Sequence, residues 1–283
     1  MSQQSNASPA IGKKSWREAK TVTAGIDIGS SSAQALIMAD DEIFCYSNVP
    51  TGANSERTAW KAMNAALEGT DLTIDDIQYT VATGYGRVIV PFSQRNLTEI
   101  ACHARGAHWF FPDVRTVLDM GGQDCKAIRV DENGKVTAFL LNDKCAAGTG
   151  RSMEIMAEIM GIQLDEIGRL SLDVDGQPKP VSSVCVVFAR SEALGLLRRG
   201  MPMNEILAAY CDALARRIYN LIQRIGMEEQ FVISGGIAKN QGVVSRIKDK
   251  FGVEAHISFE PQIVGAVGAA LFARTLAEKG AKK

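Results

Sequence analysis

The sequence predicts an α/β fold in which one structural unit is used twice. Two stretches show the same order of apolar run, aspartate, glycine-rich turn and second apolar run, with Asp27 and Asp119 at matching positions. Segments with helical spacing separate the predicted strands, and this alternation is typical of α/β architectures. A chain of 283 residues, of which 46% are hydrophobic, is long enough for two such lobes.

The first copy begins with an apolar run that leads into the turn Gly29-Ser30-Ser31-Ser32. Runs of apolar and alternating residues predict three strands, at Val22–Ile28, Ala35–Met38 and Glu42–Val49. Helical spacing predicts two helices after them, over Ala53–Leu67 and Leu97–Phe110. Gly69 and Pro112 follow these helices and are residues that end helices.

The second copy repeats the pattern around the turn Gly121-Gly122-Gln123-Asp124. It predicts three strands, at Thr116–Met120, Ala127–Val130 and Lys135–Leu141, the last two joined by an Asn-Gly hairpin signal. After a polar stretch at 163–179, which predicts a surface connection, a short strand is expected at Phe231–Ser234. The helices predicted for this part of the chain are Gly150–Met160, Ser183–Arg199, Pro202–Ile225, Asn240–Phe251 and Gln262–Lys279.

Composition excludes several classes of function. The 31 basic and 32 acidic residues give a net charge of −1, so bulk charge offers no reason to expect nucleic acid or an acidic membrane as partner. The apolar runs are shorter than the ~20 residues of a membrane-spanning helix. The first 20 residues are polar and basic and have no apolar core, so they do not resemble a secretory signal. We expect a cytoplasmic protein whose six cysteines do not form disulfides.

The two glycine-rich turns indicate phosphate binding. Such a turn exposes backbone N–H groups, and two of them can hold a polyphosphate from both sides. Asp27 and Asp119 precede the turns and suit Mg²⁺ held through water. We expect backbone N–H groups to reach phosphate from Gly29, Ser30, Ser31, Gly121 and Gly122. The pair Gly235-Gly236 ends a strand and suits close approach to a nucleoside.

Alternatives stay open for several of these side chains. Asp27 and Asp119 could cap their turns instead of holding a metal. Gln123 could orient an attacking water, or it could cap its turn. Lys239 could contact the ribose or a phosphate, or it could be an exposed, solvated lysine.

Three motifs together resemble the actin-like ATPase superfamily. They are GIDIGSSS (25–32), LDMGGQD (118–124) and ISGGIAKN (233–240), which are similar to its phosphate-1, phosphate-2 and adenosine motifs. The resemblance implies two duplicated ribonuclease-H-like lobes with ATP between them. QIVGAVGAA (262–270) resembles the second connecting helix. The implied organisation is a flexible tail at 1–20, a first lobe at 21–112 with helix 262–279 packing back on it, and a second lobe at 113–283.

A narrower resemblance rests on ATGYGR (82–87), CHARGA (102–107), NDKCAAGTGR (142–151) and SSVCVVFARSE (182–192). These segments resemble the BadF/BadG/BcrA/BcrD ATPase family, which holds benzoyl-CoA reductase ATPase subunits and 2-hydroxyacyl-CoA dehydratase activators. The resemblance implies that Cys145 and Cys185 ligate a [4Fe–4S] cluster, which takes four thiolates and is therefore shared with a second chain. The remaining cysteines, Cys45, Cys102, Cys125 and Cys211, are predicted to be buried.

The resemblance implies an ATPase that passes a low-potential electron to a catalytic partner. The implied partners are a homologous ATPase subunit or a copy of this chain, acyl-CoA-binding catalytic subunits, and a donor such as ferredoxin. Gln34 and Arg190 stand where the dehydratase activators commonly carry a lysine and an acidic residue. This departure favours the benzoyl-CoA reductase type, which reduces an aromatic acyl-CoA, with the dehydratase activator as the alternative. An actin-like small-molecule kinase and a non-enzymatic scaffold rank lower.

Overall fold

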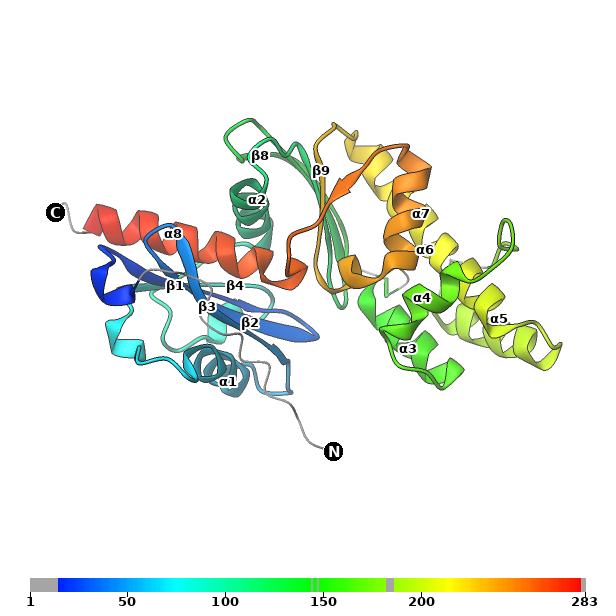
Figure 1. Cartoon of the computed structure of the whole chain (residues 1–283), viewed down its shortest axis with the longest axis horizontal. Coiled ribbons are helices and arrows are strands. Elements are labelled where there is room, and N and C mark those ends of the chain that lie inside the picture. Colours follow the sequence, from blue (N-terminus) through cyan, green and yellow to red (C-terminus); the bar gives the residue numbers. More distant parts are fainter. Residues whose placement is uncertain (1–14, 144, 147, 182–185, 281–283) are drawn as a thin grey trace. The chain divides into compact units, whose positions relative to one another are not determined.

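The computed structural model describes residues 15–143, 145–146, 148–181 and 186–280 and divides into two compact units (Figure 1). The first unit comprises Met1–Asp113, Asp131–Val136 and Gln262–Lys283, and the second comprises Val114–Val130 and Thr137–Pro261. Each unit contains a five-stranded sheet. None of the described helices is long and apolar enough to cross a membrane.

The sheet of the first unit has the order β3-β2-β1-β4-β5. The central strand β1 runs antiparallel to β2 and parallel to β4. The strands are β1 (Val22–Ile28), β2 (Ser32–Ala39), β3 (Glu42–Pro50), β4 (Tyr79–Thr83) and β5 (Arg95–Asn96). The helices of this unit are α1 (Ser55–Leu67), α2 (Glu99–Phe110) and α8 (Val264–Gly280).

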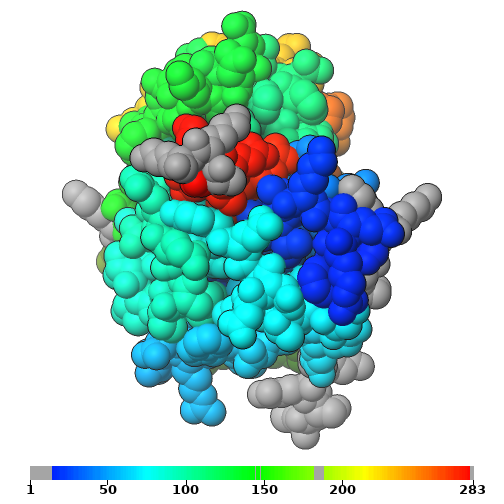
Figure 2. All heavy atoms as spheres, turned by 90° about the vertical axis from the view of Figure 1, so that its left-hand side faces the viewer, coloured from blue at the N-terminus to red at the C-terminus, as the bar shows by residue number. Residues whose placement is uncertain are grey.

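Alternate residues of β1 point to opposite faces of this sheet. Ala24 and Ile26 pack with the buried side of α1, which includes Met63. Gly25 faces α8, where an added Cβ would lie 2.0 Å from the carbonyl oxygen of Ala266. The helix therefore approaches the strand more closely than any side chain at position 25 would allow. Figure 1 shows α1 and α8 on the two sides of the sheet, and Figure 2 shows red α8 atoms among the blue and cyan atoms of this unit.

The sheet of the second unit has the order β10-β9-β6-β7-β8 and repeats the first arrangement around β6. β6 runs antiparallel to β7 and parallel to β9. The strands are β6 (Thr116–Met120), β7 (Cys125–Val130), β8 (Val136–Asn142), β9 (Phe231–Ser234) and β10 (Ala255–His256). The helices are α3 (Gly150–Met160), α4 (Glu166–Leu172), α5 (Val186–Arg198), α6 (Met203–Ile225) and α7 (Gln241–Phe251).

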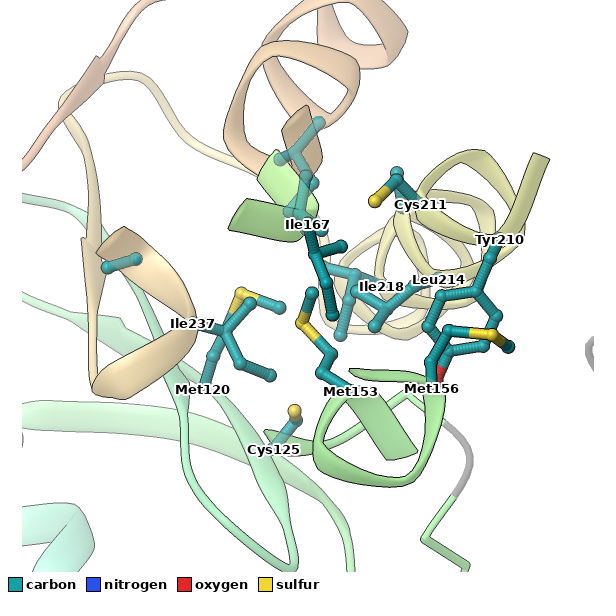
Figure 3. Packing of buried hydrophobic residues seen from close by; sticks show 14 of the residues in the cluster. Met120, Cys125, Met153, Met156, Ile167, Tyr210, Cys211, Leu214, Ile218 and Ile237 are labelled. Carbon is teal, nitrogen blue, oxygen red and sulfur yellow. The ribbon is translucent and has the colours of Figure 1, made fainter. Parts of the chain in front are cut away.

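The core of the second unit joins the start of β7 to helices α3 and α6. Figure 3 shows Met120, Cys125 and Met153 in this cluster, together with Leu214 and Ile218 of α6. All five side chains are buried. The strand residues beside the glycine-rich turn thus belong to the same packed core as the helices that follow it.

Besides the two-residue strands β5 and β10, which were not predicted, the structure departs from the predicted elements in three places. The stretch 163–179, predicted as an irregular connection, contains α4, because Ile167 and Ser171 are buried against the core. Strand β4, which was not predicted, lies beside β1, although Tyr79, Val81 and Thr83 are of residue types that favour strands. Within the segment predicted as a tail, Trp16 packs on the first unit and its Nε1 donates a 2.6 Å hydrogen bond to Asp71 Oδ1.

Candidate functional site

The two glycine-rich hairpins match position by position. In each, a short turn joins the strands, and the aspartate of the first strand pairs across the hairpin with the residue seven positions later. These pairs are Asp27 with Gln34 and Asp119 with Lys126. The first glycine of each turn donates its N–H to the carbonyl of the residue three positions later, at 3.0 Å for Gly29 and 2.9 Å for Gly121.

In the first hairpin the cross-strand partner is neutral. Gln34 is buried, and its Nε2 donates to Ser32 Oγ at 2.8 Å and to Asn48 Oδ1 at 2.9 Å. Asp27 instead has a titratable neighbour from α2, because His103 Nε2 lies 3.6 Å from its Oδ2 and both side chains are buried. The start of α8 closes this side, since a Cβ on Gly265 would lie 2.2 Å from Asp27 Oδ2. A helix N-terminus favours negative charge, so this placement suits the Asp27 carboxylate.

In the second hairpin the cross-strand partner is a buried cation. Lys126 Nζ lies 3.1 Å from Asp119 Oδ2 and 2.8 Å from Asp124 Oδ2, and all three side chains are at least 96% buried. The other carboxylate oxygen of Asp119 accepts a hydrogen bond from Ser234 Oγ at 3.2 Å. With all three groups ionised, the cluster carries one net negative charge. Such a buried arrangement is stable only when every charge has close partners, and this one meets that condition.

A glycine in the left-handed region follows the parallel strand of each unit. Gly84 follows β4 with φ +82° and Gly235 follows β9 with φ +84°. A Cβ at Gly84 would lie 2.3 Å from Asp27 Oδ1, and a Cβ at Gly235 would lie 2.9 Å from Asp119 Oδ1. Both the backbone angle and the contact with the aspartate require glycine. Each aspartate is therefore bordered by a turn on one strand and a glycine on the next.

The remaining predicted ligand residues lie at or near these turns. Ser30, Ser31 and Gly122 are half-buried turn residues, and Gln123 is exposed at the tip of the second turn. Gly236 begins a short 3₁₀ turn that ends at Lys239. The ammonium of Lys239 lies 2.8 Å from Glu260 Oε2 and the side chain is 46% exposed, so this lysine forms a surface ion pair.

The cysteines fall into two classes. Burial raises the pKa of the Cys45 and Cys102 thiols to about 12 and that of Cys211 to about 11. Cys145, by contrast, is a half-buried free thiol between β8 and α3. Cys185 lies outside the described residues. Within the described part of the chain, no group of three or more His, Cys, Asp or Glu side chains could hold a metal ion. A [4Fe–4S] cluster shared by two chains would take only two thiolates from this one.

Sequence reasoning missed the residues that hold the two aspartates. Lys126, Asp124 and His103 were not among the predicted site residues, and neither was Gly84. The hairpin geometry offers one signal that finds Lys126: a turn of this length places residue i opposite residue i+7. Spacing gives no such signal for His103, because helix α2 reaches Asp27 only through the tertiary fold, although the motifs CHARGA (102–107) and ATGYGR (82–87) contain His103 and Gly84.

Comparison with known proteins identifies the family. The model of the BadF/BadG/BcrA/BcrD ATPase family matches residues 24–273. The activator of lactoyl-CoA dehydratase from Anaerotignum propionicum is 40% identical over 257 residues, covering 91% of this chain and 99% of that protein. A benzoyl-CoA reductase subunit from Thauera aromatica is 32% identical over 273 residues, covering 93% of this chain and 96% of that protein.

The structural comparison agrees with the sequence comparison. The solved structure of the activator of the 2-hydroxyisocaproyl-CoA dehydratase from Clostridium difficile, with bound ADPNP, has a TM-score of 0.88 and 34% identity. The match covers 93% of this chain and 97% of that one. The predicted actin-like α/β fold is confirmed. The chain therefore belongs to the BadF/BadG/BcrA/BcrD ATPase family.

Proposed function

We propose that this chain is the ATP-hydrolysing activator of a 2-hydroxyacyl-CoA dehydratase. The observation that carries the proposal is the 40% identity with the lactoyl-CoA dehydratase activator over nearly the whole of both chains, against 32% with the benzoyl-CoA reductase protein. Gln34 and Arg190 by themselves favour the benzoyl-CoA reductase type over the dehydratase activator. Identity over some 260 positions outweighs two substitutions, so the dehydratase activator takes precedence.

The hairpins would supply the ATPase chemistry. Asp27 and Asp119 would hold Mg²⁺ through water, an outer contact in which the oxygens of Asp119 also keep Lys126 and Ser234 as partners. The N–H groups of Ser30, Ser31 and Gly122 would face phosphate, while those of Gly29 and Gly121 close their turns. Gly235 and Gly236 would border the adenosine. Gln123, exposed at the tip of its turn, would orient the attacking water.

Cys145 and Cys185 would hold a [4Fe–4S] cluster together with two thiolates of a second chain, in this proposal a copy of the same chain. The half-buried position of Cys145 supports its part, because a cluster ligand has to be reachable from a partner. When bound, such a cluster carries one electron at a potential set by its surroundings. The electron would come from a low-potential donor such as ferredoxin and go to the dehydratase, which itself binds the acyl-CoA.

The first test is iron content. The chain is purified anaerobically, and iron and acid-labile sulfide are measured per chain for the wild type, Cys145→Ala and Cys211→Ala. About two iron atoms per chain are expected for the wild type and Cys211→Ala, and none for Cys145→Ala, because one shared cluster needs all four thiolates. Unchanged iron in Cys145→Ala would remove this cysteine from the proposal.

The second test separates the two partner types. The chain, MgATP and a chemical reductant are combined with a purified 2-hydroxyacyl-CoA dehydratase and its substrate, and formation of the 2-enoyl-CoA is followed. A parallel reaction supplies the catalytic subunits of a benzoyl-CoA reductase and benzoyl-CoA. ATP-dependent turnover in the first reaction alone is the expected result. Turnover in the second alone would restore the reductase assignment.

A further inference from the structure

The loop that carries Cys145 rests directly on the second glycine-rich turn. The described residues of this loop, 145, 146, 148 and 149, precede α3, whose first two residues donate their backbone N–H groups to the turn. Gly150 N–H donates to Gly121 O at 2.9 Å, and Arg151 N–H donates to Gly122 O at 2.7 Å. The first N–H groups of a helix have no partner within the helix, so the turn serves as the cap of α3. A Cβ at Gly150 would lie 3.2 Å from Gly121 O, so the contact is also tight.

A third hydrogen bond links the same two segments through a side chain. Cys125, the first residue after the turn, donates from Sγ to Gly148 O at 2.9 Å. Its side chain is fully buried beside Met153 of α3, as Figure 3 shows. Burial raises the pKa of this thiol well above its ordinary value, so it stays protonated and remains a donor. Neither the ATPase chemistry nor the proposed cluster uses this cysteine.

The far side of the loop is held by α6. Gly148 has φ +88°, and a Cβ there would lie 2.8 Å from Cδ of Arg217. Arg217 Nη2 donates to Asn142 Oδ1 at 3.3 Å, and Asn142 Nδ2 donates to the carbonyl of Cys145 at 3.4 Å. The carbonyl of Cys145 and the backbone of Gly148 therefore have partners in Asn142 and α6 on one side and in Cys125 of β7 on the other. A displacement of the turn has to be accommodated by this loop.

We propose that Cys125 is a positioning residue that, with the first turn of α3, couples the glycine-rich turn 121–124 to the loop of Cys145. Nucleotide bound at the turn would change the environment of the Cys145 thiol through these three hydrogen bonds. The inference rests on the proposed function in one respect, the presence of nucleotide at this turn. It adds the hydrogen bonds through which the turn would act on Cys145, and it names Cys125 as the residue whose removal should weaken this coupling.

The experiment uses the full chain, reduced and free of iron, with and without saturating MgAMPPNP. Two readouts are taken, neither of which requires enzymatic turnover. Hydrogen–deuterium exchange resolved to Gly150 and Arg151 reports the capping bonds, because exchange follows local opening. The rate of alkylation of Cys145 by iodoacetamide at pH 8 is followed by peptide mass spectrometry, which separates it from every other cysteine. The raised pKa values of Cys45, Cys102 and Cys211 keep those thiols protonated under these conditions.

The variants remove or keep the donor at position 125. Cys125→Ala and Cys125→Val both lack it, and valine preserves more of the volume in case alanine does not fold. Cys125→Ser keeps an O–H donor. Cys211→Ala is the matched control, because it removes a buried thiol of α6 from the same core.

In the wild type, AMPPNP should slow exchange at Gly150 and Arg151 and change the alkylation rate of Cys145. Without nucleotide, loss of the Cys125 bond should speed exchange at these amides about fivefold, the factor for one hydrogen bond of ordinary strength. The nucleotide response of Cys145 should be weakened in Cys125→Ala and Cys125→Val, which keep only the two backbone hydrogen bonds of Gly150 and Arg151, and it should persist in full in Cys125→Ser and Cys211→Ala.

Failure of the proposed function and failure of the coupling would give different results. If the wild type binds no AMPPNP by calorimetry, the proposed function fails. If it binds AMPPNP but neither readout responds, the coupling is overturned and the ATPase assignment stands. If Cys125→Ala and Cys125→Val respond as the wild type does, Cys125 has no part in the coupling.

Discussion

The two glycine-rich hairpins share a backbone and differ in how their aspartates are held. In the second, the hairpin itself supplies the counter-charge, since Lys126 sits opposite Asp119 and also binds Asp124. In the first, the matching position holds the neutral Gln34, and the neighbour of Asp27 is His103 from a separate helix. The comparison shows that the turn geometry does not depend on the charge pair. It also shows that the same aspartate position can be secured locally in one unit and by the tertiary fold in the other.

The largest expected effect comes from removing the buried cation. Lys126→Gln leaves Asp119 and Asp124 close together without a counter-charge. Breaking a buried ion pair from one side costs about 3–5 kcal/mol, so the free energy of unfolding should fall by that amount. Urea denaturation followed by circular dichroism measures it.

The first hairpin supplies the control for this change. The double variant Asp124→Ser/Lys126→Gln gives the second hairpin the Ser-Gln pair found at positions 32 and 34. It should recover part of the lost stability, because one of the two uncompensated carboxylates is gone. A double variant less stable than Lys126→Gln alone would contradict the view that the hairpins are interchangeable.

The second prediction concerns catalysis by the first hairpin. Asp27→Asn should lower the rate of MgATP hydrolysis about 100-fold, the scale for losing one electrostatic contact in an active site. Steady-state kcat measured by phosphate release is the readout, with unfolding followed in parallel. His103→Gln should lower the rate less, since it lies beside Asp27 and acts only through it. A larger effect for His103→Gln than for Asp27→Asn would reverse these roles.

The third prediction tests whether Gly84 and Gly235, which border Asp27 and Asp119 at matching positions, contribute equally to stability. Gly84→Ala and Gly235→Ala should each destabilise the protein by about 2–3 kcal/mol. The causes are backbone strain and clashes with an aspartate oxygen and with the carbonyl oxygen of Ile28 or Met120. Gly69→Ala is the control, because it has φ +78° but no atom within 4 Å of the added Cβ. It should cost about 1 kcal/mol by the same denaturation assay. Equal costs at all three positions would mean that the close contacts at Gly84 and Gly235, those with the aspartates included, are unimportant.

The smallest expected effect is at Gln34. Gln34→Ala removes two partly buried neutral hydrogen bonds and should lower the free energy of unfolding by about 1–2 kcal/mol. The exposed Gln78, which donates to Lys20 O, provides a surface amide for comparison, and Gln78→Ala should change stability by less than ~0.5 kcal/mol. If Gln34→Ala were as costly as Lys126→Gln, the distinction between a neutral and an ionic hairpin would fail.

Local sequence patterns were sufficient to predict the two hairpins. The strands flanking Gly29 and Gly121 follow from alternation and turn chemistry, and the structure contains both. The pairing of Asp119 with Lys126 is within reach of the same reasoning once the turn length is known. The same local patterns also revealed that the aspartate–glycine turn occurs twice.

Features that depend on distant contacts were not predictable in this way. The helix at Glu166–Leu172 forms because Ile167 is buried by other segments, which overrides its polar surroundings. The same holds for His103 beside Asp27 and for the capping of α3 by Gly121. In each case the partner lies tens of residues away, and no local spacing reveals it.

The position of α8 has a consequence for the order in which the chain acquires its structure during synthesis. This helix packs against β1, β4 and α2, yet it follows the whole second unit in the sequence. While the ribosome is still translating the second unit, this side of the first sheet lacks α8, and apolar residues such as Leu36 and Val81 have only the packing that α2 provides. The N-terminal unit, although made first, is completed last. A chaperone that binds nascent apolar strands would therefore have its longest opportunity at this face.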